Sequence, residues 1–102
     1  MENISVQELR SRLNAGEKLH LVDVREPDEN AAFNIGGILL PLGKIHSMEF
    51  GDIEHLKEEE LIVYCRSGNR SQQAALFLEM TGFKNLKNLS GGLLEWKKDI
   101  TT

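Results

Sequence analysis

Short apolar runs alternate with segments of helical pattern along this chain of 102 residues, and that alternation limits the fold more than any other feature. Each run is too short for a core helix, and two of them are rich in β-branched residues, as buried strands are. Parallel strands need a crossover that covers the sheet. The pattern therefore predicts an α/β fold, a parallel sheet with helices on both faces. The expected strands are residues 19–24, 38–41, 61–65 and 83–89.

The expected helices carry terminal signals. Ser5 and Glu8 stand at capping-box spacing and Gly16 lies where a C-terminal glycine belongs, so residues 5–16 are expected to be helical. The segment 45–56 is too weakly patterned to assign. The charged run 57–60 is interpreted as a solvated face or turn without function. Further helices are expected at residues 27–32, 71–80 and 91–96.

Composition disfavours several functional classes. The 12 basic and 16 acidic side chains give a net charge of -4, which disfavours a nucleic-acid partner. Apolar runs of only a few residues and an N-terminus without a signal-peptide pattern predict no membrane segment and a cytoplasmic location. The length predicts a single domain over residues 1–102. One cysteine and three scattered histidines predict no disulfide and no metal.

The loop between the clearest strand and the clearest helix carries the chemistry. It reads Cys-Arg-Ser-Gly-Asn-Arg-Ser over residues 65–71. Ligands of open parallel sheets bind at the carboxyl ends of strands, and Cys65 is expected at such an end. Arg66 and Arg70 are the only charged residues between positions 61 and 78. A thiol beside guanidinium groups at a helix N-terminus has a stabilised thiolate.

The remaining loop residues favour an anion-binding conformation. Gly68 and Asn69 tolerate a positive φ, so the loop can turn its N–H groups inward as a nest centred on the sulfur of Cys65. A lone free cysteine is most often an inert buried residue. The arginines, the glycine and the small hydroxyl residues in one loop reverse that preference and predict a reactive nucleophile.

Three segments of the chain together resemble the rhodanese family of sulfurtransferases. They are residues 65–71, the Asp-Val-Arg-Glu-Pro segment 23–27 with Glu29, and the Leu-Ser-Gly-Gly segment 89–92 with Trp96. They occur in the family's order and spacing, and the resemblance covers nearly the whole chain. It implies a five-stranded parallel sheet, no cofactor, and a cysteine that carries sulfane sulfur as a persulfide. By this resemblance Cys65 is the nucleophile and residues 66–70 form the loop around it.

Loop length separates two chemistries within this resemblance. Cys65 to Arg70 inclusive is six residues, a C-x4-R pattern, whereas related cysteine phosphatases and arsenate reductases use C-x5-R. A tighter ring of N–H donors suits one transferred sulfur atom, while a tetrahedral oxyanion needs a wider ring. The loop therefore favours sulfur transfer.

The expected reaction is a double displacement. The Cys65 thiolate attacks the outer sulfur of a donor such as thiosulfate and then passes the sulfur to an acceptor, which is cyanide or a thiol of a small molecule or a thioredoxin-like protein. Arg66 and Arg70 would attract the anionic donor. The loop amides and the hydroxyls of Ser67 and Ser71 would stabilise the persulfide.

One region departs from the family pattern. The histidine that often follows the Asp-Val-Arg segment is absent from residues 33–38, and the run to Pro41 is one residue shorter. Asp23 and Arg25 are possible pocket-edge residues or a surface pair. Two alternatives stay open at this point. One is a binding or regulatory module on the same fold without turnover, which would not need the thiol, and the other, less favoured, is a cysteine phosphatase or arsenate reductase.

Overall fold

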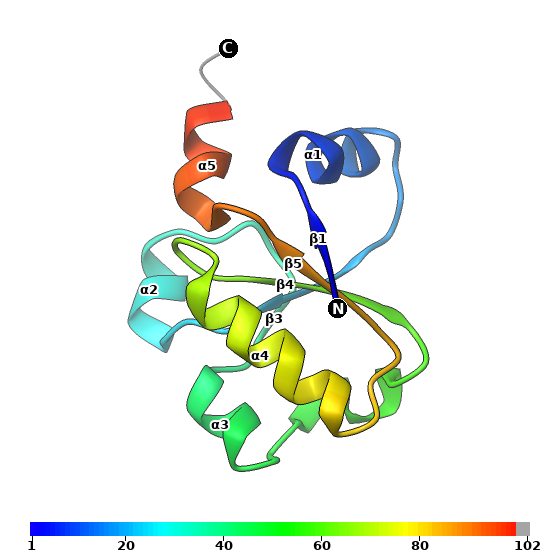
Figure 1. Cartoon of the computed structure of the whole chain (residues 1–102). Coiled ribbons are helices and arrows are strands. Elements are labelled where there is room, and N and C mark those ends of the chain that lie inside the picture. The colour runs from blue at the N-terminus through cyan, green and yellow to red at the C-terminus, as the bar shows by residue number, and fades with distance from the viewer. Residues whose placement is uncertain (100–102) are drawn as a thin grey trace.

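The computed structural model describes residues 1–99 as a five-stranded parallel sheet in the order β1-β5-β4-β2-β3. Figure 1 shows the arrangement. The elements in chain order are β1 (Glu2–Ile4), α1 (Val6–Asn14), β2 (His20–Asp23), α2 (Pro27–Ala32), β3 (Ile38–Leu39), α3 (Leu42–His46), the 3-10 helix η1 (Gly51–Leu56), β4 (Glu60–Tyr64), α4 (Asn69–Met80), β5 (Asn85–Leu89) and α5 (Gly92–Asp99).

The central strand β4 shows why both faces of the sheet are covered. Its side chains alternate, with Leu61 and Val63 on one face and Ile62 and Tyr64 on the other, and all four are fully buried. A strand that is apolar on both faces needs a helical layer on each side. The sequence predicted this architecture, and the structure confirms it.

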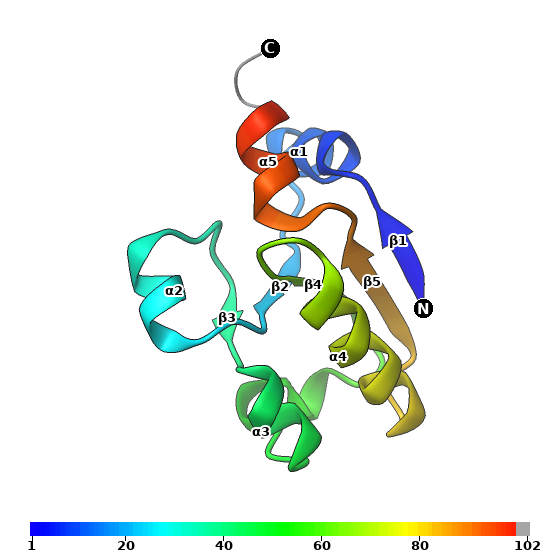
Figure 2. The ribbon, with the colours of Figure 1, turned by 60° about the vertical axis from the view of Figure 1, so that its left-hand side comes forward.

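Two helical layers enclose the sheet. α1 and α5 pack on one face, where Leu9 and Trp96 join Tyr64 in one buried cluster. α3, η1 and α4 pack on the other, where Ile45 and Leu78 belong to a second cluster. Figure 2 shows α1 and α5 together on one side of the strands, with α2 standing apart from both layers.

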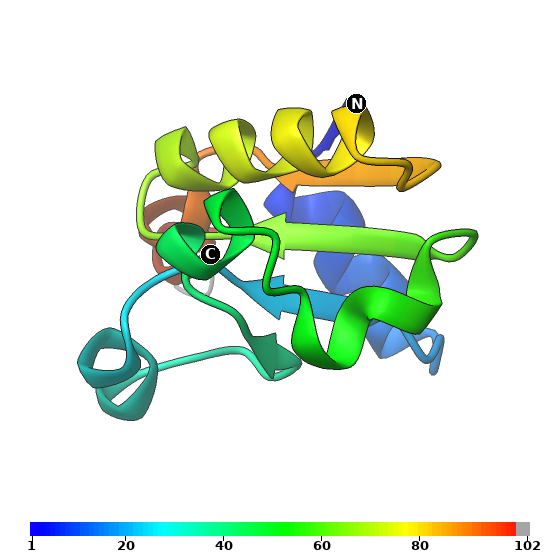
Figure 3. The same ribbon diagram turned by 90° about the horizontal axis from the view of Figure 1, so that it is seen from below.

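The strands run in one direction, so their carboxyl ends meet at one edge of the sheet. Figure 3 shows β2, β4 and β5 side by side, with the loop after β4 turning back into α4 at that edge. Ser5 accepts a hydrogen bond from Glu8 N and caps α1, as its spacing predicted.

The bounds of several elements differ from the sequence-based expectations, among them β3, which ends at Leu39 rather than at residue 41, and α5, which extends to Asp99. β1 was not expected, because a three-residue edge strand shows no periodicity. α4 begins at Asn69 rather than at residue 71. The unassigned segment 45–56 contains the end of α3 and all of η1. Glu60, interpreted as part of a solvated run, opens β4 and pairs with Arg12 and Lys87, because those long side chains reach it from α1 and β5.

Candidate active site

Cys65 lies directly after the last residue of β4, at the carboxyl edge of the sheet, and is 1% exposed. Its Sγ accepts hydrogen bonds from the backbone nitrogen of Gly68 at 3.1 Å and of Ser71 at 3.4 Å. The Ser71 hydroxyl oxygen also lies 3.4 Å from Sγ. Gly68 adopts a φ of 98°, and this left-handed turn brings the amides round to the sulfur. The loop is therefore a ring of donors centred on one sulfur atom.

The surroundings act on the thiol in opposite directions. Burial raises the pKa of Cys65, while hydrogen bonds from Ser71, Gly68 and Ser67 lower it, and the hydrogen bonds win, so the pKa lies below its ordinary value. Stabilisation of the thiolate thus comes from the loop itself. The sequence attributed it to the helix N-terminus and the neighbouring arginines. No guanidinium group donates a hydrogen bond to Sγ within residues 1–99, and Arg70 interacts with the thiolate through its charge alone.

The N-terminus of α5 holds the opposite side of the loop. Leu93 N donates to Cys65 O and Leu94 N donates to Arg66 O, both at 3.0 Å. A Cβ at Gly92 would lie 2.5 Å from Cys65 O and 2.6 Å from Arg66 O, so only glycine permits this approach. The Gly-Gly segment thus lets α5 pack closely against the loop. The carbonyl groups of Cys65 and Arg66 point toward α5, and the loop amides remain free to donate to the sulfur.

The two loop arginines have different surroundings. Arg70 donates two hydrogen bonds to the Glu29 carboxylate, at 2.7 and 2.8 Å. With the Glu26 backbone N–H, the Arg70 guanidinium lowers the pKa of Glu29 to about 2. Arg66 is exposed, and its guanidinium group makes no hydrogen bond or ion pair within the described part of the chain. Arg66 is thus the guanidinium group open to an anionic ligand, whereas Arg70 anchors α4 to α2.

The other loop residues lie as follows. Ser67 and Asn69 are exposed beside Arg66, and Asn69 begins α4 without a positive φ. Ser71 is fully buried, and its hydroxyl group donates to Asn88 Oδ1 on β5. The structure therefore brings Cys65, Gly68 and Ser71 into mutual contact and leaves Ser67 and Asn69 at the solvent-facing rim.

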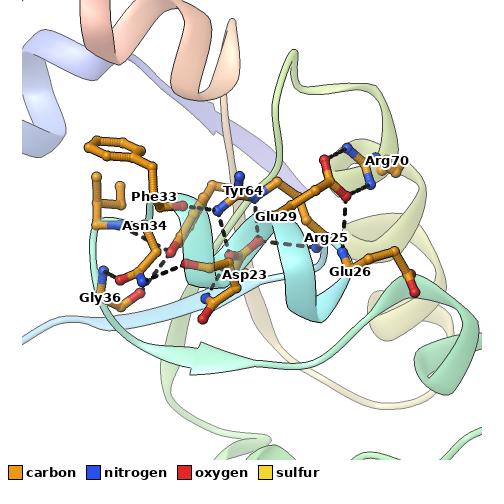
Figure 4. A network of polar contacts seen from close by, with 11 residues as sticks. Asp23, Arg25, Glu26, Glu29, Phe33, Asn34, Gly36, Tyr64 and Arg70 are labelled. Carbon is orange, nitrogen blue, oxygen red and sulfur yellow. Dashed lines mark hydrogen bonds and ion pairs between the residues drawn. The ribbon is translucent and has the colours of Figure 1, made fainter.

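Asp23 and Arg25 form a buried pair at the same edge of the sheet. Arg25 donates to both carboxylate oxygens of Asp23, at 2.9 and 2.8 Å, and the pair is 0% and 6% exposed. Asn30 donates to Asp23, and Arg25 also donates to Phe33 O at 2.6 Å. Figure 4 shows this network beside the Glu29–Arg70 pair. Asp23 and Arg25 bond each other and the segment after β2, and neither contacts Sγ.

Tyr64 secures the segment that departs from the family pattern. Its hydroxyl group donates to Gly36 O at 2.9 Å and accepts from Ile35 N at 3.4 Å (Figure 4). Burial raises the pKa of Tyr64 to about 12, so the phenol stays protonated and keeps donating. This tyrosine precedes Cys65 directly, so one strand end positions both the Cys65 thiol and the neighbouring segment.

Sequence reasoning missed the roles of three residues at the site. Glu29 was noted only as part of the resemblance, and its partner Arg70 lies 41 positions later, a separation that no local pattern reveals. Tyr64 read only as a strand residue. Asn88 lies 17 positions after Ser71. The sequence offered one hint of its role, a polar amide side chain within a segment expected to be a strand.

Metal-binding clusters and membrane-spanning helices are absent from residues 1–99, and a surface pocket there does not include the Cys65 loop. Within residues 1–99 no group of three or more potential ligands could hold a metal ion, and no helix there is long and apolar enough to cross a membrane. A surface pocket of about 310 Å³ between β3, α3 and η1 is lined by none of the residues of the Cys65 loop.

Fold and site together define a small parallel α/β protein with a buried thiol at a strand end. Residues 5–99 match the family model of the rhodanese-like domain. This chain belongs to the rhodanese-like domain family.

Several relatives have sulfurtransferase names. The chain is 39% identical to a Schizosaccharomyces pombe protein provisionally named a mitochondrial thiosulfate sulfurtransferase, over 93% of this chain and 75% of that protein. It is 35% identical to a sulfurtransferase of Allochromatium vinosum, over 96% and 90% of the two chains. The solved structure of the human single-domain sulfurtransferase TSTD1 is 28% identical, covers 96% of each chain and has a TM-score of 0.79.

Proposed function

We propose that this protein transfers sulfane sulfur from an anionic donor such as thiosulfate, carrying it as a persulfide on Cys65. The observation that carries the proposal is the loop geometry, in which Gly68 N and Ser71 N both donate to Sγ of a buried thiol whose pKa lies below its ordinary value. Such donors favour the thiolate and therefore the nucleophile. The sulfurtransferase names of the relatives support the same assignment.

Loading is a nucleophilic displacement at sulfur. The Cys65 thiolate attacks the outer sulfur of thiosulfate, an S–S bond forms, and the S–S bond of thiosulfate breaks with its electron pair leaving on sulfite. Sγ becomes neutral, sulfite carries away the electron pair, and the outer sulfur of the persulfide keeps a negative charge. No proton moves, so no general base is required.

The rim of the site suits an anionic donor. Arg66 is exposed and carries no bound carboxylate in residues 1–99, so its guanidinium group is free to meet the sulfonate end of thiosulfate. Ser67 and Asn69 are exposed on the same loop and offer further polar contacts. Arg70 contributes by holding the loop through Glu29.

Discharge requires an acceptor from outside the chain. Cys65 is the only cysteine of the sequence, so no second thiol of this chain can resolve the persulfide. An acceptor thiolate or cyanide attacks the outer sulfur, the persulfide S–S bond breaks, and its electron pair returns to Cys65 as the thiolate. The acceptor thiol belongs to a small molecule or to a thioredoxin-like protein.

Intact-mass spectrometry tests the proposal. Incubation with thiosulfate is expected to add the mass of one sulfur atom to the protein, and a small thiol is expected to remove it. Cys65→Ser should show no gain, while Ser47→Ala, an exposed change outside the loop, should load as the original protein does. A folded protein that gains no sulfur would instead favour a binding or regulatory module.

A further inference from the structure

Behind the nucleophile, the buried side chain of Asn88 joins the active-site loop to β5. Asn88 is 3% exposed, and its Nδ2 donates to Gly68 O at 3.3 Å and to Asn3 Oδ1 at 3.4 Å. Its Oδ1 accepts from the hydroxyl group of Ser71, which is fully buried. Asn88 thus touches the loop at two points without touching Sγ.

The orientation of the Asn88 amide follows from its neighbours. A backbone carbonyl can only accept, so the group facing Gly68 O must be the amide nitrogen. The amide oxygen then faces Ser71 Oγ, and because Oδ1 carries no hydrogen, the hydroxyl group must donate to it. The single hydroxyl hydrogen of Ser71 is therefore committed to Asn88.

That commitment decides the direction of the contact between Ser71 and Cys65. With its hydrogen on Asn88, Ser71 Oγ faces Sγ, 3.4 Å away, with a lone pair, so the neutral thiol is the donor. A thiolate has no hydrogen to donate. To stabilise the thiolate, the Ser71 hydroxyl group must turn its hydrogen to the sulfur and leave Asn88 Oδ1, a buried acceptor, without it.

We propose that Asn88 is a positioning residue that competes with the Cys65 sulfur for the hydroxyl hydrogen of Ser71 and so sets how readily the thiol ionises. The amide holds the hydrogen while the thiol is neutral and releases it when the sulfur becomes charged. Asn88 acts only through Ser71, because it makes no hydrogen bond with Sγ within residues 1–99.

The competition also bears on the sulfur-loaded protein, a consequence that rests on the proposed function. In the persulfide the charge sits on the outer sulfur, and Sγ, now bonded to two atoms, needs less stabilisation. The Ser71 hydrogen can then return to Asn88. Asn88 therefore raises the free energy of the free thiolate more than that of the persulfide. This difference favours retention of the sulfur on Cys65 until an acceptor binds.

Within residues 1–99, no charged side chain on the surrounding elements donates a hydrogen bond to Sγ in place of the Ser71 hydroxyl group. Arg66 follows Cys65 in the loop, and Arg70 of α4 is paired with Glu29 of α2. Asp23, the last residue of β2, is paired with Arg25. Glu95 of α5 pairs with Lys98 at the surface. None of these groups donates a hydrogen bond to Sγ, and Glu29 stays ionised at any pH where a thiol titrates because its pKa is about 2.

The thiol can be titrated directly by its ultraviolet absorbance as a thiolate. Cys65 is the only cysteine, and Tyr64, the only tyrosine, has a pKa raised by burial to about 12, so the two signals are separate. The variants are Asn88→Leu, which keeps the side-chain length but cannot accept, Ser71→Ala, and the double variant. Asn3→Ala is the matched control, since it removes the other contact of the amide.

Asn88→Leu is expected to lower the titration midpoint by about 0.7 in pH, a roughly fivefold larger thiolate fraction below the midpoint, because one hydrogen bond is released to the sulfur. Ser71→Ala should raise the midpoint, and the double variant should equal Ser71→Ala. Asn3→Ala should leave it unchanged. Circular dichroism confirms folding, and Asn88→Ala replaces the leucine variant if that variant does not fold.

The proposal is overturned if Asn88→Leu leaves the midpoint unchanged or raises it, or if its effect persists without the Ser71 hydroxyl group. A merely structural role for Asn88 would not depend on Ser71 in this way. The titration uses no sulfur donor. Failure of thiosulfate to load the protein would therefore count against the proposed function and leave this test intact.

Discussion

Substitution of Gly92 by alanine probes the contact between α5 and the active-site loop. A Cβ at this position would lie 2.5 Å from Cys65 O and 2.6 Å from Arg66 O, and Gly92 has a φ of 58°. Both neighbours are backbone atoms, which cannot swing aside as a flexible side chain can. The overlap is relieved only if α5 moves away from the loop.

The expected cost has two parts. A left-handed φ costs a residue with a side chain about 1 kcal/mol. Movement of α5 also lengthens the bonds from Leu93 N and Leu94 N to the loop carbonyls, now 3.0 Å each. At about 1 kcal/mol for each bond, Gly92→Ala should lower the free energy of unfolding by about 3 kcal/mol in all. That is a large part of the 5–15 kcal/mol or so typical of a domain.

Urea denaturation of three alanine variants separates the two parts. Gly16 has a φ of 87° and nothing within 4 Å of its would-be Cβ, so Gly16→Ala reports the φ cost alone. Gly43 has neither a positive φ nor a close neighbour, and Gly43→Ala within α3 should be neutral or slightly stabilising. The expected order of stability is Gly43→Ala, then Gly16→Ala, then Gly92→Ala.

The same variants distinguish a local effect from a general one. Gly92→Ala should also slow sulfur loading of Cys65, because the loop carbonyls it displaces belong to the residues around the nucleophile. Gly16→Ala should load at the original rate. If Gly92→Ala costs no more stability than Gly16→Ala, the contact with the loop is not rigid and the reasoning fails.

Further predictions concern single contacts. Arg66→Ala should raise KM for thiosulfate several-fold with little loss of stability, since Arg66 is exposed and unpaired in residues 1–99, and an unchanged KM would refute its anion-binding role. The Glu29–Arg70 pair stabilises the fold above pH 4.5, and this contribution is lost as pH falls toward 2, so in urea titrations Glu29→Gln should flatten the pH dependence over that range. Tyr64→Phe should lower the free energy of unfolding by about 1–3 kcal/mol, because Gly36 O loses its donor, and equal midpoints in urea would contradict this.

The parts of the site that the sequence predicts are local. The position of Cys65 follows from a strand that ends where a helix begins, and the turn at Gly68 follows from the conformational freedom of glycine. Both depend on residues within a few positions of each other. The parallel sheet with two helical layers was predictable for a similar reason, since strands and helices alternate along the chain.

The parts that the sequence does not predict depend on distant partners. The sequence predicted that Arg70 binds the anionic donor. In the structure its two hydrogen bonds to the Glu29 carboxylate instead connect α4 to α2. Asn88 reaches the loop only because β5 lies beside β4 in the sheet. β1 forms because it pairs with β5, the last strand of the chain, and three residues carry no pattern of their own.

The anchoring of residues 33–36 bears on how this part of the chain can vary between related proteins. Arg25 and Tyr64 hold it by the carbonyl oxygens of Phe33 and Gly36, atoms that every amino acid supplies. Side chains there can be exchanged without loss of these two bonds, so a histidine is dispensable. Gly36 and Gly37 are the exceptions, since Gly36 has a φ of 98° and a Cβ on Gly37 would lie 2.1 Å from Leu21 O. Substitution is thus tolerated at residues 33–35 and restricted at these two glycines.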